Sequence, residues 1–231
     1  MDEVEFDKFA QEYRTLHAAN IRLSGESPEY FAEYKVRDVA AALQRAGTTG
    51  PLAILDFGAG VGYSVPHFAR HLPTARVTCL DVSRQSLAVG AAQHGAAAAF
   101  AHFDGVTIPF PEASFDVAFA SCVFHHISED EHVALFRELR RVLRPAGSLF
   151  VFEHNPLNPL TRHAVNTCPF DANARLLGAA TLRRRLRAAG FTEVALCYRI
   201  FFPGPLRWLR PLERWLGWLP LGAQYSVSAR R

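Results

Sequence analysis

Carboxylates and imidazoles follow successive apolar runs of the chain, at or beside the places where strands of a sheet would end. These residues are Asp56, Asp81, Asp104, His125, His126, Glu153 and His154. Carboxylates can accept hydrogen bonds from hydroxyl and amino groups or hold a cation, and histidine can move a proton near neutral pH. The pattern therefore predicts a polar binding cleft with acid–base groups along one edge of a sheet.

A glycine loop stands at the first of these places. Gly58, Gly60 and Gly62 alternate behind Asp56, after an apolar run and before an amphipathic stretch. This order predicts a strand, a tight loop and a helix. Glycine lets a ligand lie directly against the backbone, and a helix N-terminus offers free N–H groups. We therefore expect an adenosine-containing ligand at this loop.

The loop departs from the dinucleotide fingerprint in a way that narrows the ligand. Tyr63 stands where the third glycine of that fingerprint would be, and Asp56 would repel a pyrophosphate. An acid in this place suits a cationic ligand. S-adenosylmethionine carries a sulfonium and an ammonium group and no phosphate, so it fits both features.

Two further carboxylates give the expected ligand its orientation. Asp81 lies about 20 residues past the glycines, where a carboxylate can accept both ribose hydroxyls. Asp104 can accept from the exocyclic amine of adenine, whose ring Phe103 or Val82 can flank. Ligands of parallel sheets bind outside the carboxyl ends of the strands, so these groups converge. The predicted donor-binding residues are Asp56, Gly58, Ala59, Gly60, Gly62, Asp81, Val82, Phe103, Asp104, Gly105 and Ser121.

Apolar runs alternate with amphipathic, capped segments from residue 52 to residue 153. We expect strands at 52–57, 76–80, 96–101, 114–121 and 148–153, and helices at 28–45, 64–71, 84–94 and 129–143, with Ser27, Ser83 and Ser128 as N-caps. Thr181 is expected to cap a helix that ends at 189, before strands at 194–202 and 223–229. This alternation predicts an α/β fold, a doubly wound and mostly parallel sheet.

Three segments flank or interrupt this pattern. Residues 1–48, with an amphipathic helix at 3–20, are predicted to form a helical lid in front of a domain of residues 49–231. Residues 154–180 begin with a Pro/Asn-rich run, are expected to be irregular to Asp171, and are predicted to form an active-site loop. Residues 203–222 form an insertion in which Trp and Leu interleave with Arg, the composition of an interfacial helix.

Composition places the chain among ordinary globular proteins. Its 231 residues are 49% hydrophobic, and the net charge of +3 is too small to indicate a nucleic-acid partner. The four cysteines show neither CxxC pairs nor zinc-ligand spacing, so we expect no disulfides, no metal and a reducing compartment, the cytoplasm. The acidic N-terminus is unlike a signal peptide, and no apolar run is long enough to span a membrane.

Six motifs between Leu52 and Phe152 share a pattern with a known family: Ile54–Gly62, Leu80–Ser83, Phe103–Asp104, Ser114–Val117, His125–Ile127 and Val142–Leu149. They resemble the class I (Rossmann-like) S-adenosylmethionine-dependent methyltransferases, in particular the type-11/12 and ubiquinone-biosynthesis-like branches. The resemblance implies seven strands, the last antiparallel and inserted beside the fifth, with Asp81 on the ribose and Asp104 near adenine. Ala146 stands where the family usually has glycine, and residues 203–222 lie outside the common pattern.

Methyl transfer from a sulfonium is an in-line displacement, for which a protein mainly aligns the reacting atoms and excludes water. A base is needed only for a weak nucleophile such as a phenol or alcohol. The candidate catalytic residues are His126, Glu153 and His154, and the predicted acceptor-binding residues are Tyr13, His125, Asn155 and Arg162. The alternative for the imidazoles is packing, and for the asparagines it is Asx turns.

The predicted activity is therefore methyl transfer to a small natural-product or lipid-like acceptor, with S-adenosylhomocysteine as product. A nicotinamide-dependent oxidoreductase is one alternative, which the missing third glycine and Asp56 disfavour. A non-catalytic ligand-binding domain on the same fold is another. Residues 203–220 could contact a membrane surface, grip a lipid-like acceptor, form a homodimer contact or simply pack over the sheet edge.

Overall fold

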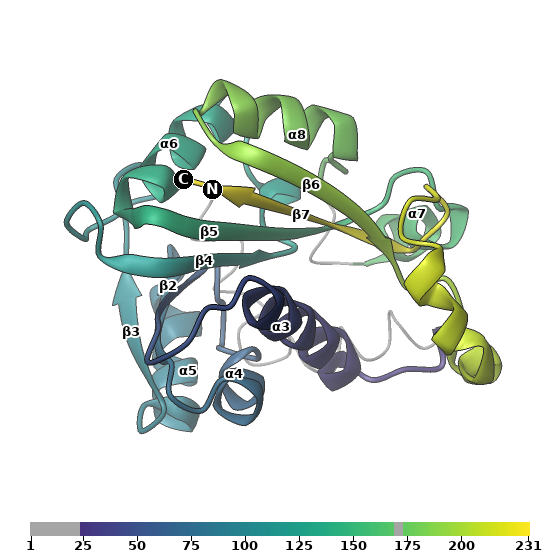
Figure 1. Ribbon diagram of the computed structural model, residues 1–231, viewed down its shortest axis with the longest axis horizontal. Helices are drawn as coiled ribbons and strands as arrows, with labels where there is room; N and C mark the ends of the chain where they lie inside the picture. The colour runs from purple at the N-terminus through teal and green to yellow at the C-terminus, as the bar shows by residue number, and fades with distance from the viewer. Residues whose placement is uncertain (1–23, 169–172) are drawn as a thin grey trace.

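The computed structural model describes residues 24–168 and 173–231, so the expected helix at 3–20, with Tyr13, lies outside the described residues. Figure 1 shows a central twisted sheet between two layers of helices. The sheet has seven strands in the order β3-β2-β1-β4-β5-β7-β6. The strands are β1 Ala53–Phe57, β2 Arg76–Asp81, β3 Ala98–His102, β4 Phe115–Ser121, β5 Leu143–His154, β6 Thr192–Arg199 and β7 Gln224–Arg230.

The pairing of the strands confirms the expected topology. The first five strands pair in parallel, with Ile54 opposite Val117 between β1 and β4. β7 is antiparallel to both β5 and β6, and it lies between them. All five parallel strands therefore end at the same edge of the sheet, where the predicted site residues stand.

Helices cover both faces of the sheet. α6 (His132–Val142) and α8 (Ala179–Ala188) lie on one face, and α3 (Pro28–Arg45), α4 (Val65–His71) and α5 (Arg84–His94) lie on the other (Figure 1). α7 (Pro159–Thr167) and two 3₁₀ segments, η2 (Phe124–His126) and η4 (Gly204–Trp215), stand outside these layers. Among the described residues, no helix has the length and apolar character needed to cross a bilayer.

Two hydrophobic cores hold the layers together, one on each face. Leu139 of α6 and Leu186 of α8 belong to one cluster, while Phe31 of α3 and Phe68 of α4 belong to the other. Because α3 shares a core with the sheet, the described part of residues 1–48 is continuous with the main domain. A lid function for the segment before α3 stays a prediction.

Local sequence signals explain where several helices begin. Ser27 caps α3 by accepting from the Tyr30 N–H, and Ser83 caps α5 by accepting from the Ser86 N–H, as predicted. The expected role of Ser128 is wrong, because its hydroxyl donates to Asp130 at 2.5 Å and α6 begins only at His132. Thr181 is not a cap either: it lies inside α8, whose N-cap is Gly178.

The segment after β5 is more regular than expected. The prediction of irregular structure from 154 to 171 is wrong over residues 159–167, which form α7. The side chain of Asn158 accepts from the Thr161 N–H, and Pro159 occupies the first helical turn. Asparagine as N-cap followed by proline is a helix-start signal that the Pro/Asn content of the run concealed.

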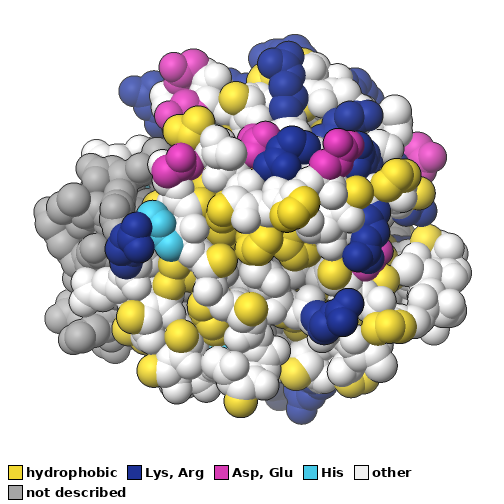
Figure 2. Space-filling view, turned by 90° about the vertical axis from the view of Figure 1, so that its left-hand side faces the viewer, with side chains coloured by type: hydrophobic (Ala, Val, Ile, Leu, Met, Phe, Trp, Pro, Cys, Tyr) yellow, Lys and Arg dark blue, Asp and Glu magenta, His cyan; other side chains and the backbone are white. Residues whose placement is uncertain are grey.

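Figure 2 shows the side of the molecule at the left of Figure 1, away from α7. Basic and acidic side chains are interspersed over the upper part of this view, and hydrophobic side chains lie mainly over its middle and lower part. This face therefore shows no extended surface of one charge sign.

Candidate functional site

The glycine loop is shaped by left-handed backbone conformations. Gly58 and Gly60 have φ of 69° and 54°. A Cβ on Gly58 would lie 2.6 Å from both methyl carbons of Val123, whereas a Cβ on Gly60 would meet no atom within 4 Å. Gly58 thus lets the loop pack against the residues after β4, and Gly60 leaves open space where a ligand can approach the backbone.

Asp81 ties this loop to the start of α5. One carboxylate oxygen accepts from the Gly60 N–H at 2.7 Å and the other from the Ser83 N–H at 2.9 Å. Burial raises the pKa of Asp81, and these backbone hydrogen bonds oppose that rise. Each carboxylate oxygen has a second lone pair that can accept a further hydrogen bond. The contact of Asp81 with ribose hydroxyls stays a prediction.

Asp56 lies buried behind the loop and accepts a hydrogen bond from the Ser64 hydroxyl. Burial raises the pKa of Asp56 to about 7, the Ser64 hydrogen bond and Lys35 oppose the rise, and Asp81 adds to it. A cation beside Asp56 would favour its ionised form. The site therefore holds a carboxylate whose charge a cationic ligand would stabilise.

The residues predicted near adenine differ in exposure. Phe103 and Val82 are buried, and the Phe103 ring centroid lies 5.4 Å from that of Phe57. Asp104 is exposed and accepts from the N–H groups of Val106 and Thr107, which lower its pKa. Contacts of these residues, and of Ala59, Gly62 and Gly105, with a nucleoside stay predictions.

The ends of β4 and β5 bring three histidines together. The ring centroid of His125 lies 4.2 Å from that of His126 and 5.1 Å from that of His154. His125 is buried, while His126 and His154 are half-buried. Residues from two neighbouring strand ends thus form one cluster, as the sequence predicted from parallel pairing.

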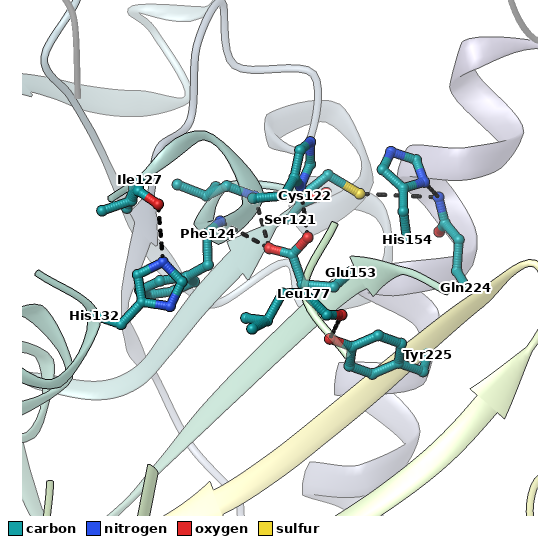
Figure 3. Close-up of polar contacts among 12 residues, drawn as sticks. Ser121, Cys122, Phe124, Ile127, His132, Glu153, His154, Leu177, Gln224 and Tyr225 are labelled. Atoms are coloured by element: carbon teal, nitrogen blue, oxygen red, sulfur yellow. Dashed lines mark hydrogen bonds and ion pairs between the residues drawn. The ribbon is translucent and has the colours of Figure 1, made fainter. Parts of the chain in front are cut away.

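Glu153 is fully buried beneath this cluster (Figure 3). One carboxylate oxygen accepts from the N–H groups of Val123 and Phe124, at 3.1 and 2.8 Å, and the other lies 2.6 Å from His125 Nδ1. Burial alone would raise the pKa of Glu153, but the His125 charge and hydrogen bond outweigh it and lower the pKa. An ionised carboxylate with three hydrogen-bond donors therefore holds the loop after β4. These contacts favour a positioning role, and the role of Glu153 as a base stays a prediction.

The hydrogen-bond partners of His125 and His154 indicate how the Nδ1 atom of each ring is used. An ionised Glu153 can only accept, so His125 Nδ1 carries a proton. The Tyr34 hydroxyl donates to Gln224 Oε1, which turns Gln224 Nε2 toward His154 Nδ1 at 3.4 Å (Figure 3). In this arrangement the Gln224 amide faces the His154 Nδ1 lone pair.

Lys35 and Cys122 were not among the predicted site residues. Lys35 of α3 is only 5% exposed, and its ammonium donates to Ser121 Oγ at 2.8 Å and to Cys122 Sγ at 3.2 Å. The sequence held a signal for Lys35, since Phe31, Lys35 and Val39 recur at helical spacing on the buried face of α3. A lysine within an apolar stripe reaches a polar partner inside the fold.

Cys122 stands in an unusual conformation and environment. Its φ is +58°, which is rare for a residue other than glycine and clusters at functional sites. Burial opposes ionisation of the thiol, but the Lys35 ammonium and His154 lower the pKa of Cys122 to about 6. The carboxyl end of β4 therefore places a readily ionised thiol beside a buried ammonium group.

Asn155 and Arg162, two of the predicted acceptor-binding residues, lie outside the histidine cluster. Asn155 is buried, its amide N–H groups donate to the carbonyls of Pro220 and Gly222, and its oxygen accepts from the Leu157 N–H. These contacts favour the alternative expectation, an Asx turn that holds the loop, and a contact between Asn155 and an acceptor stays a prediction. Arg162 is exposed on α7, and its contact with an acceptor stays a prediction. Within residues 24–168 and 173–231, no group of three His, Cys, Asp or Glu residues could hold a metal ion.

Residues 54–147 match the family model of a methyltransferase domain. Over 137 residues the chain is 28% identical to a ubiquinone/menaquinone biosynthesis C-methyltransferase of Hahella chejuensis, covering 56% of this chain and 54% of that protein. Over 180 residues it is 33% identical to the O-methyltransferase cnsE of Penicillium expansum, covering 73% and 61%. The chain thus spans little more than half the length of these curated relatives.

The fold is shared with a solved structure, an S-adenosylmethionine-dependent methyltransferase from Thermotoga maritima. The TM-score is 0.68 at 18% identity, and the comparison covers 99% of this chain and 98% of the other. The family match, the sheet order and the glycine loop with its carboxylates agree with one another. Residues 54–147 are therefore a methyltransferase domain, and the chain has the class I, Rossmann-like fold of S-adenosylmethionine-dependent methyltransferases.

Proposed function

We propose that this chain transfers the methyl group of S-adenosylmethionine to a small-molecule acceptor at the carboxyl ends of β1, β2, β4 and β5. One observation carries the proposal: the open space at Gly60 is accompanied by two buried carboxylates, Asp56 and Asp81, and by the buried ammonium of Lys35. The donor has a sulfonium, an ammonium, a carboxylate and ribose hydroxyls. The carboxylates of the site can therefore meet the cationic groups and hydroxyls of the donor, and the Lys35 ammonium can meet its carboxylate.

Each of these residues has a distinct role in holding the donor. The Asp81 carboxylate accepts from the ribose hydroxyls, and Asp56 lies toward the cationic amino acid end. Lys35 has three N–H donors, of which two already bond Ser121 and Cys122, so a third can meet the donor carboxylate. With this assignment the buried Lys35 ammonium has the donor carboxylate as a partner in addition to Ser121 and the Cys122 thiol.

S-adenosylmethionine supplies an electrophilic methyl group on a sulfonium. The residues of the chain bind and orient the reactants, and alignment of this kind can lower a barrier by about 7–11 kcal/mol. The ionised Glu153, with Val123, Phe124 and His125, fixes the loop after β4 that borders the reacting groups. The rigid loop keeps the acceptor side in one geometry.

For a phenol or alcohol acceptor, we propose His126 as the base. His125 is buried against Glu153, and the Nδ1 lone pair of His154 faces Gln224, whereas His126 is half-buried beside the cluster. The expected result for His126→Ala is a fall in turnover of about 100-fold with little change in donor affinity. A parallel loss of donor affinity would contradict this role.

The test of the proposed function is a calorimetric titration with S-adenosylmethionine, S-adenosylhomocysteine and NADH. We expect binding of the first two. Asp81→Ala should weaken S-adenosylmethionine by about 1–3 kcal/mol, because ribose hydroxyls lose their acceptor. Tight binding of NADH alone would favour an oxidoreductase and overturn the proposal.

The acceptor is proposed to be a biosynthetic intermediate with an apolar body and a phenolic, enolic or hydroxyl group. Two relatives, a ubiquinone/menaquinone biosynthesis C-methyltransferase and an O-methyltransferase, support this class. Mass spectrometry of reactions with quinols, phenols and hydroxylated lipids tests it. Donor binding without methylation of any acceptor class would favour the non-catalytic alternative.

A further inference from the structure

The segment η4 presents its apolar side chains outward and its polar anchors inward. Trp208 and Trp215 are 71% and 58% exposed, and Trp218, just after η4, is 75% exposed. By contrast, Arg210 bonds Glu26 and the Phe202 carbonyl, and its guanidinium lies over the Tyr30 ring. This orientation is the reverse of an ordinary surface helix, whose apolar face meets the core.

The inward contacts hold the segment in place. Glu213 accepts from the N–H groups of Phe201 and Phe202, at 2.9 and 3.0 Å, and the Arg210–Glu26 pair joins η4 to the residues before α3. None of the residues of η4 is buried. The outward tryptophans are therefore displayed by a fixed scaffold.

The apolar face extends onto the neighbouring segment. Leu157, just before α7, Leu160, in its first turn, and Leu221 are exposed. Hydrogen bonds from Asn158 to the Leu221 carbonyl and from Asn155 to the Pro220 carbonyl join the residues before α7 to the residues that follow η4. In Figure 1 they lie beside each other at the right-hand end of the molecule, where η4 is yellow. We call this surface, made of Leu157, Leu160, Trp208, Trp215, Trp218 and Leu221, the tryptophan face.

Two cations accompany the tryptophan face. Arg207 and Arg214 are exposed, and the Arg214 guanidinium lies 3.9 Å above the Trp215 ring. Tryptophan places its ring at the boundary between headgroups and acyl chains, and exposed arginines attract anionic headgroups. A two-fold dimer through the same face would bring these arginines of two copies together, which like-charge repulsion opposes.

We propose that the tryptophan face docks on the surface of a bilayer that contains anionic lipids. The candidate site lies close to the tryptophan face. Asn155, which is hydrogen-bonded to Pro220 beside this face, directly follows His154 of the histidine cluster. Resting on the proposed function, the inference also gives the acceptor its source: an apolar molecule that enters the site from the bilayer. The contact is interfacial, with the tryptophan rings inserted and the sheet outside the membrane.

Intrinsic tryptophan fluorescence reports on this contact, because all three tryptophans of the chain belong to the tryptophan face. Added vesicles of phosphatidylcholine with phosphatidylglycerol should shift the tryptophan emission to shorter wavelength, and brominated acyl chains should quench it. Vesicles of phosphatidylcholine alone should bind more weakly, and added salt should weaken the anionic vesicles' advantage. Unchanged emission and no quenching with either vesicle would overturn the proposal.

Substitutions distinguish binding through the tryptophan face from nonspecific hydrophobic adsorption to vesicles. Trp208→Ser with Trp218→Ser should lower co-sedimentation with anionic vesicles by about tenfold or more, and Arg207→Glu with Arg214→Glu should remove the preference for anionic lipid. Val106→Ser is the matched control, because Val106 is 66% exposed in the loop between β3 and β4, and it should change nothing. An equal loss with the control would overturn the assignment.

Two further measurements distinguish the competing outcomes. Sedimentation velocity without lipid should show no tryptophan-dependent dimer; a dimer lost in the double tryptophan variant, with no vesicle binding, would overturn the bilayer in favour of a second copy. Calorimetry with S-adenosylmethionine should give the same affinity for the double variant and the native chain. Vesicle binding by a chain that binds no donor would leave this inference standing while the proposed function fails.

Discussion

His125 and Glu153 form a fully buried pair, with His125 Nδ1 2.6 Å from a carboxylate oxygen of Glu153. The other carboxylate oxygen of Glu153 gathers two backbone N–H groups from the residues after β4. One side chain at the end of β5 thus organises the neighbouring strand's loop. This relationship favours a positioning role for Glu153, and His126 is the proposed base.

Removing Glu153 should cost stability rather than turnover alone. Glu153→Ala leaves His125 and two N–H groups without their acceptor, and we expect a loss of about 3–5 kcal/mol in urea unfolding. Glu153→Gln keeps one acceptor oxygen for the N–H groups and should cost less. Since folding lowers the pKa of Glu153, its contribution is present above the unfolded pKa and is lost as the pH falls through the folded value. Glu153→Gln with native stability and no turnover would instead indicate a base.

Lys35→Met should weaken donors that carry a carboxylate. For S-adenosylmethionine we expect a loss of about 10–100-fold in affinity, because a charge-assisted hydrogen bond is removed. Decarboxylated S-adenosylmethionine lacks the anion and should bind the variant and the native chain alike. Calorimetry with both ligands, with Lys35→Arg as the charge-retaining control, measures the difference. Equal losses for both ligands would remove Lys35 from the carboxylate site.

Two glycine substitutions in one loop should fail in different ways. Gly60→Ala adds a methyl group to open space, so the chain should still fold, at a cost of about 1–2 kcal/mol for the left-handed backbone, and lose donor affinity. Gly58→Ala forces a methyl group against Val123 and should lower the thermal midpoint strongly. Adding Val123→Ala should restore part of that loss. Equal thermal midpoints for the two single variants would contradict this distinction.

Donor affinity should rise with pH near neutrality. The pKa of Asp56 is about 7 in the folded chain, so its carboxylate ionises as the pH rises through that value, and the ionised form attracts the cationic donor. Between the unfolded pKa and pH 7 the folded state retains this proton, so stability falls with rising pH over the same range. Titrations of the native chain and Asp56→Asn isolate the effect, since only the native chain should show it. An identical pH profile in the variant would exclude Asp56.

Ala146→Gly should stabilise the protein by about 1 kcal/mol. Ala146 has φ +63°, a left-handed conformation in which the Cβ of alanine is strained and glycine is not. Ala88→Gly is the control with the opposite sign, because residue 88 is exposed within α5 and glycine should cost about 1 kcal/mol there. Urea unfolding of both variants gives the comparison. A loss of stability in Ala146→Gly would show that the turn adapts without strain.

Much of the fold followed from short-range patterns. Ser27 and Ser83 cap their helices as predicted, because an N-cap contact spans only three residues and is written in adjacent positions. Ser128 and Thr181 carried the same signal and failed, because an N-cap residue caps only where the helix after it begins. Asn158 shows the converse, a cap and helix inside a run whose composition indicated a loop.

The sequence by itself determined the parallel sheet and the glycine loop and predicted the donor, because strand periodicity and loop chemistry are local properties of the chain. Only the tertiary structure decided that Lys35 meets Ser121 and Cys122 across 86 and 87 positions, that Glu153 is held by His125, and that the tryptophans face outward. Those facts depend on which helix face packs against which strand end. Helical spacing puts Lys35 on the buried face of α3, but it does not say which strand end that face meets. Hydrogen-bond partners between distant segments are set by that packing.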